Sequence, residues 1–181
     1  MRYFFRRYIP KFERILLVES GSRYLADALL PGLEKLYPDM QLDLVTCFAG
    51  LPKGFREDRG RVWRVTDYQG RSARSRLYAE IASRRHTICG IICTGEPIMT
   101  KWKWILAARS SGKVFILNEN GDYFWLDYSN WTTIRHFILF RTGLAGAGAA
   151  RTLLRLVLLP FTLAYLLLYA ATLHLRRRWN S

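Results

Sequence analysis

Residues 13–46, ERILLVESGSRYLADALLPGLEKLYPDMQLDLVT, decide the fold of most of the chain. The stretch begins with an apolar run at 14–18, which is typical of a strand buried on both faces. Ser22 then precedes leucines at helical spacing, and Pro38 ends that pattern. A second apolar run follows at 41–46. The stretch therefore predicts a strand, a helix and another strand.

The same alternation continues downstream. It predicts three more strands and two more helices, at 61–66, 71–85, 87–93, 97–110 and 113–117. Asn120-Gly121 is typical of a turn, and it leads into a short hairpin arm at 123–126. Strands that alternate with helices predict an α/β domain at 12–130, with a doubly wound, mostly parallel, five-stranded Rossmann-like sheet.

The segment 156–175, LVLLPFTLAYLLLYAATLHL, carries no formal charge. Twenty helical residues span roughly 30 Å, the thickness of a bilayer core. The segment therefore predicts a transmembrane helix, or a re-entrant one if Pro160 kinks it. The residues expected to contact the headgroups flank it on both sides: Arg151, Arg155, Arg176, Arg177, Arg178 and Trp179.

The remaining segments are basic. Residues 1–11 combine cations with aromatics and are expected to form either a second surface contact or a frayed end. Residues 131–155 predict a membrane-proximal helix or a Gly/Ala-rich connector, and 176–181 form a basic tail.

Charge is distributed unevenly along the 181 residues, whose formal net charge is +14. Residues 128–181 contain seven arginines and no carboxylate. This excess beside an apolar segment suits a membrane with anionic headgroups and makes nucleic acid the less favoured partner. Without an export signal at the N-terminus, the protein is expected at the cell inner membrane, single-pass or monotopic, with the α/β domain in the cytoplasm.

Cysteine and histidine give no sign of a metal or a disulfide framework. The cysteines number three, and Cys89 and Cys93 lie in an apolar run that favours buried core positions. The histidines are scattered, and His86, beside two arginines, is expected to be exposed. No metal and no cofactor is predicted.

Candidate site residues follow the expected strands, because ligands of doubly wound sheets bind beyond the carboxyl ends of the strands. With the strands in the order 3-2-1-4-5, three carboxylates would line one crevice as a general base or as ligands of sugar hydroxyls: Glu19, Glu96 and Glu119. The ligand-binding candidates at the same edge are Ser20, Gly21, Ser22, Arg23, Asp67, Gln69, Thr94 and Asn118. The helix start after Gly21 could hold an anion, or could be a plain helix cap.

Several of these features together resemble the N-terminal half of GT-B glycosyltransferases of the heptosyltransferase type. The matching residues are Ile15–Val18, Gly21, Pro31, Tyr37-Pro38 and Leu42–Val45. Two departures stand out. The family usually has a Gly-Asp pair in the first loop where this chain has Gly21-Ser22, and an apolar segment stands where the nucleotide-sugar domain would follow.

The resemblance implies a membrane-anchored, glycosyltransferase-like protein of a cell-envelope glycan or glycolipid pathway. Without the second domain, it would be accessory or dependent on a partner glycosyltransferase or other glycan-pathway protein. Two alternatives stay open. The chain could be an enzyme that acts on its own on a lipid-linked or nucleotide-linked substrate, or a basic membrane-bound adaptor without a ligand.

Overall fold

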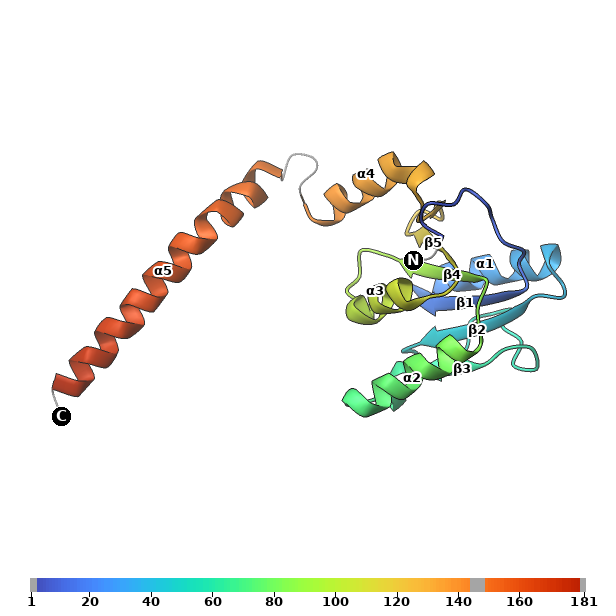
Figure 1. Cartoon of the computed structure of the whole chain (residues 1–181), viewed down its shortest axis with the longest axis horizontal. Coiled ribbons are helices and arrows are strands. Elements are labelled where there is room, and N and C mark those ends of the chain that lie inside the picture. Colours follow the sequence, from blue (N-terminus) through green and yellow to red (C-terminus); the bar gives the residue numbers. More distant parts are fainter. Residues whose placement is uncertain (1–2, 144–148, 180–181) are drawn as a thin grey trace. The chain divides into compact units, whose positions relative to one another are not determined.

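The computed structural model describes residues 3–143 and 149–179, and within the last helix it describes the side chains of 154, 155 and 157–170. The chain forms two compact units, Met1–Trp131 and Thr132–Ser181 (Figure 1). Each unit is described by itself below.

In the first unit, strands and helices alternate as the hydrophobic pattern predicts. The elements are β1 (Arg14–Glu19), α1 (Arg23–Leu36), β2 (Gln41–Thr46), β3 (Val62–Arg64), the 3-10 turn η1 (Val65–Asp67), α2 (Arg71–Ser83), β4 (Ile88–Cys93), α3 (Thr100–Arg109), β5 (Lys113–Asn118), β6 (Tyr123–Trp125) and the 3-10 turn η2 (Tyr128–Asn130).

The strands form one sheet in the order β3-β2-β1-β4-β5-β6. The pairs among the first five strands are parallel, and β6 is antiparallel to β5, with Phe115 opposite Trp125. The mostly parallel α/β sheet is therefore confirmed. The expected number of five strands is wrong, because the hairpin arm at 123–126 pairs as a sixth strand across a turn in which Gly121 has φ +82°.

Two elements are shorter than the sequence pattern predicts. The helix expected from 97 begins at Thr100, after Met99, which has the left-handed φ of +49°. The strand expected at 61–66 ends at Arg64, where the chain tightens into η1. In both places the residues stay apolar across a backbone turn, so the apolar pattern alone does not predict where the element begins or ends.

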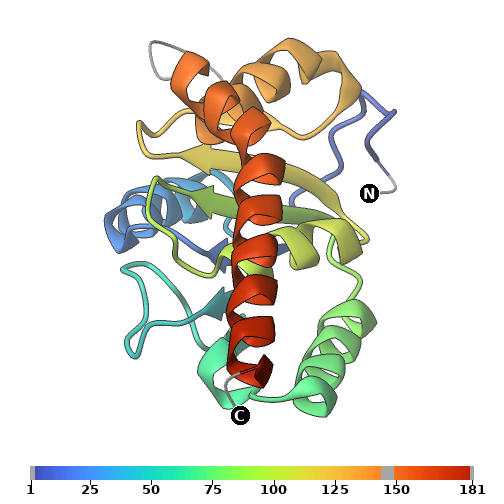
Figure 2. The same ribbon diagram turned by 90° about the vertical axis from the view of Figure 1, so that its left-hand side faces the viewer.

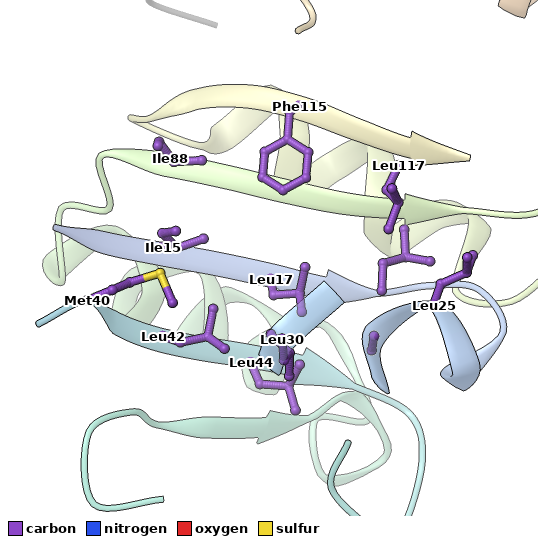
Figure 3. Close-up of a cluster of buried hydrophobic side chains, with 12 residues drawn as sticks. Ile15, Leu17, Leu25, Leu30, Met40, Leu42, Leu44, Ile88, Phe115 and Leu117 are labelled. Atoms are coloured by element: carbon purple, nitrogen blue, oxygen red, sulfur yellow. The ribbon is translucent and has the colours of Figure 1, made fainter. Parts of the chain in front are cut away.

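The core lies in two layers, one on each face of the sheet. Ile15 and Leu17 of β1 face α1, whereas Leu16 and Val18 face α2 and α3, as the alternation of side chains along a strand requires. Figure 2 shows α1 (blue) and α2 (green) on opposite sides of the strands. The cluster under α1 is drawn in Figure 3. One helix thus covers one face, and two helices cover the other.

The described part of the N-terminal segment, 3–11, is bonded to the sheet. The buried Lys113 Nζ donates to the carbonyl oxygens of Arg6 and Tyr8, at 3.0 and 3.2 Å. The backbone N–H of Tyr128 donates to the carbonyl of Phe4 at 2.9 Å. The segment is therefore fixed through its backbone instead of fraying.

The second unit contains α4 (Trp131–Arg141), whose first residue belongs to the first unit, and α5 (Ala149–Trp179). α5 runs through Pro160 as one helix, so the described residues around Pro160 contain no turn of the kind that a re-entrant segment would need (Figure 1). Of the transmembrane helix predicted at 156–175, the side chains of 156 and 171–175 lie outside the described residues. Among the residues that the structure does describe, no helix combines the length and the apolarity that crossing a bilayer requires.

Candidate functional site

The carboxyl edge of the sheet carries most of the residues predicted to form the site. β1, β4 and β5 are adjacent, and they end at Glu19, Cys93 and Asn118. The loops that follow these strands are therefore neighbours. The strand order that the predicted crevice required is present.

Glu19 is fully buried and both of its carboxylate oxygens are bonded. Arg23 donates to them through Nε (2.8 Å) and Nη2 (3.1 Å), and Thr46 Oγ1 donates to Oε2 at 2.6 Å. Arg23 also donates to the carbonyl of Gly50 and lies 4.8 Å from the ring centroid of Phe48. A carboxylate that is enclosed in this way fixes α1 and the loop after β2, and it has no path to a substrate proton.

The first loop packs tightly against the end of β4. Ser20 is buried, and its hydroxyl donates to the carbonyl of Ile92 at 2.6 Å. A Cβ on Gly21 would lie 2.7 Å from Cγ2 of Thr94, which is itself buried. These residues hold the loop against the sheet, so their small size serves packing.

Two contacts join the loops at the surface. Ser22 Oγ donates to the exposed Glu96 at 2.9 Å, and the Tyr24 hydroxyl donates to the carbonyl of Glu119 at 3.0 Å. Ser22 makes no side-chain cap to its own helix. An anion bound at the start of α1 would meet the negative charge of Glu96, which weakens the predicted anion site.

The other predicted ligands have separate roles or positions. Asn118 Oδ1 accepts the backbone N–H groups of Asn120 and Asp122, at 3.0 and 2.9 Å, and so shapes the β5–β6 turn. Asp67 and Gln69 are exposed after β3, two strands away from β1. The structure therefore brings the loops after β1, β4 and β5 together but leaves Asp67 and Gln69 apart from them.

The residues predicted to contact a membrane belong to α5. Arg155 is exposed. The side chains of Arg151, Arg176, Arg177, Arg178 and Trp179 lie outside the described residues, and their predicted role stays a prediction.

A buried polar cluster that the sequence did not predict surrounds Asp43. Arg84 Nε and His86 Nε2 lie 2.6 and 2.8 Å from Asp43 Oδ2, and the Arg61 N–H donates to Oδ1 at 2.8 Å. Burial raises the pKa of Asp43, but the hydrogen bonds from His86, Arg61 and Arg84 outweigh it, and the pKa is lowered. The expectation that His86 is exposed is wrong, because its ring is buried and lies within hydrogen-bonding distance of the buried Asp43 carboxylate. An aspartate in the middle of an apolar strand was the available signal.

A second buried ion pair joins Lys113 and Asp127, with 2.7 Å between Nζ and Oδ2. Burial raises the pKa of Asp127, and the Lys113, Ser129 and Asn130 hydrogen bonds lower it further than burial raises it. Among the cysteines, Cys89 and Cys93 are buried as predicted, and burial raises the pKa of Cys89 to about 12. Such a thiol is unreactive at neutral pH.

Two grooves of the described surface lie away from the predicted crevice. A groove of about 670 Å³ lies at the amino ends of the strands, beside the stacked rings of Phe12 and Tyr37. A second groove of about 550 Å³ runs beside α1, and every residue that lines it is uncharged.

No family model, curated protein or solved structure matches the chain.

Proposed function

We propose that the protein is an accessory, membrane-attached component of a cell-envelope glycan or glycolipid pathway. In this proposal α5 inserts into the bilayer, and the α/β unit holds a partner enzyme or an acceptor at the membrane surface. The observation that carries the proposal is the exposure of apolar side chains on every side of α5 over its described residues 157–170.

Residues 157–170 make about four helical turns without a charged side chain. Their large apolar side chains are all exposed, from 48% for Leu158 to 72% for Leu167. Since successive residues point about 100° apart, these side chains cover all faces of the helix. A helix that lies on the membrane surface would keep one polar face, so this pattern favours insertion.

Charge supports the same placement. No acidic residue follows Asp127, and seven arginines do. Each cation near an anionic leaflet contributes roughly 1 kcal/mol of attraction.

The state of the carboxyl edge favours an accessory role over independent catalysis. Glu19, the first candidate base, is buried among Arg23 and Thr46, and Ser22 is bonded to Glu96. The assignment to a glycan pathway rests on the resemblance of residues 13–46 to GT-B glycosyltransferases.

Liposome flotation of the purified chain tests the attachment. The intact chain is expected to float with the vesicles and to stay with them after an alkaline wash. Leu163→Arg with Leu167→Arg should abolish flotation, because an arginine costs about 2.5–3.5 kcal/mol at the centre of an inserted helix. Leu163→Ala with Leu167→Ala is the matched control and should still float. An intact chain that remains in the aqueous fraction would refute the proposal.

Affinity capture from detergent-solubilised membranes tests the pathway. An accessory component should retain a glycosyltransferase or another protein of glycan synthesis and should transfer no sugar by itself. Sugar transfer by the purified chain would instead support the stand-alone enzyme. Capture of no glycan-pathway protein, with flotation intact, would support the adaptor without a ligand.

A further inference from the structure

We infer that the first unit carries a second membrane-contacting surface, fitted to anionic lipid headgroups. It consists of the N-terminal segment 3–11, the C-terminal half of α1 and the β5–β6 hairpin; it is called the hairpin face below. The inference rests on the proposed attachment through α5, but the residues involved are different.

Among the described helices of the first unit, α1 is the one that packs on this side of the sheet. Beside α1 the uncharged groove of about 550 Å³ stays open. The groove is lined by Leu33 and Leu36 of α1, by Phe115 and Tyr123 of the hairpin, and by Ile9 of the N-terminal segment. A groove of this volume with an apolar lining is typical of a site that receives an apolar group.

Large apolar side chains project from the segments that form this groove. Phe5 is 84% exposed, Leu36 71%, Tyr123 69% and Tyr8 63%. Leu36 and Tyr123 line the groove, and Phe5 and Tyr8 belong to the segment whose Ile9 lines it. Single exposed apolar residues are ordinary, but several on the elements that form an apolar groove mark an interaction surface. Three of the four are aromatic, and tyrosine in particular prefers the headgroup level of a bilayer.

The charges of the N-terminal segment indicate what kind of partner the hairpin face binds. The N-terminal segment 3–11 contributes three exposed cations and no acid: Arg6, Arg7 and Lys11. The other two elements carry both signs of charge, with Lys35 beside Glu34 in the last turn of α1, and Glu119 and Asp122 in the hairpin. Cations that surround aromatic and aliphatic side chains match the anionic headgroup layer, with its acyl boundary beneath. Each such cation strengthens attachment to an anionic leaflet about five-fold.

The way in which the segment is held leaves these side chains available. Lys113 bonds the backbone carbonyls of Arg6 and Tyr8, and Tyr128 bonds that of Phe4. Substitution of the side chains at 5–8 therefore preserves the contacts that fix the segment.

Amide hydrogen exchange of the full chain in nanodiscs tests the inference. The nanodiscs contain phosphatidylcholine alone or with one-third phosphatidylglycerol. The amides of 3–11 should exchange several-fold more slowly in the anionic discs than in the neutral ones. Arg6→Glu with Arg7→Glu should remove that difference. Arg71→Glu with Arg76→Glu, which makes the same charge change at exposed positions of α2, should keep it.

The outcomes separate this inference from the attachment itself. A chain that enters the discs but exchanges at 3–11 equally in both lipids overturns the hairpin face and leaves the role of α5 standing. A chain that does not enter the discs overturns the attachment. Protection that appears in detergent and grows with protein concentration shows that a second copy covers the face, which also overturns the inference.

Discussion

Glu19 illustrates how a charged residue can occupy a catalytic position and still serve the fold. Glu19→Gln would place an amide among the donors of Arg23 and Thr46, and would leave Arg23 without its counter-charge. We expect the free energy of unfolding to fall by about 3 kcal/mol, measured by urea denaturation. Glu96→Gln is the exposed control and should change it by about 0.5 kcal/mol or less. A stable Glu19→Gln chain that loses function would instead make Glu19 catalytic.

Asp43 should make the stability depend on pH. Its pKa is lowered from 3.8 in the folded chain, so the unfolded chain binds the proton more readily. The stabilisation by Asp43 is therefore complete above the unfolded pKa, and it is lost as the pH falls through the lower, folded pKa. Chemical denaturation between about pH 6 and pH 3 should show stability falling with acid, less steeply in Asp43→Asn. Equal slopes in both chains would contradict the assignment.

The residues that pair over long distances are the ones that the sequence could not reveal. Asp43 meets His86 and Arg84 more than 40 positions away. A charged residue in an apolar strand signals that a partner exists, but nothing local identifies it. The carboxyl-edge residues were predictable, because the topology rule brings strand ends together whatever their side chains are. Which of them are enclosed, as Glu19 is, depends on packing.

At the scale of elements, the pair of Lys113 and Asp127 joins β5 to the chain before α4 and holds the N-terminal segment. Lys113→Met should cost about 3–5 kcal/mol, because Asp127 would stay buried without its partner. Amides of 3–11 should also exchange faster, since two backbone carbonyls lose their donor. Adding Asp127→Leu should restore much of the stability but not the slow exchange.

If Lys113→Met left both the free energy of unfolding and the amide exchange of 3–11 unchanged, Lys113 would not hold the N-terminal segment. A double variant that restores slow exchange would show that packing, and not the lysine, holds the segment.

Elements with strong periodicity were predicted to within a residue or two, and β2 was predicted in full. The start of α3 and the end of β3 were not, because backbone turns at Met99 and after Arg64 interrupt patterns that stay apolar. The sixth strand was visible only as a hairpin arm. Its pairing depends on the open edge of β5, which a linear pattern does not show.

At the scale of the whole molecule, the two units have different surfaces. The first has an ordinary two-layer core on either side of its sheet. In the second, the described side chains of 157–170 stay exposed although most of them are large and apolar. Exposed apolar surface of this extent costs roughly 1.5–3 kcal/mol per large side chain in water, so a non-aqueous environment for α5 would stabilise the chain.

The environment of Leu167 is the property to measure. A spin label at Leu167→Cys, in a chain with Cys47→Ser, reports its depth through its relative accessibility to oxygen and to a water-soluble nickel complex. In liposomes, high oxygen accessibility and almost no nickel accessibility are predicted, as for the hydrocarbon core. A label that the nickel complex reaches as readily as it reaches one on an exposed residue of α2 would contradict the insertion of α5.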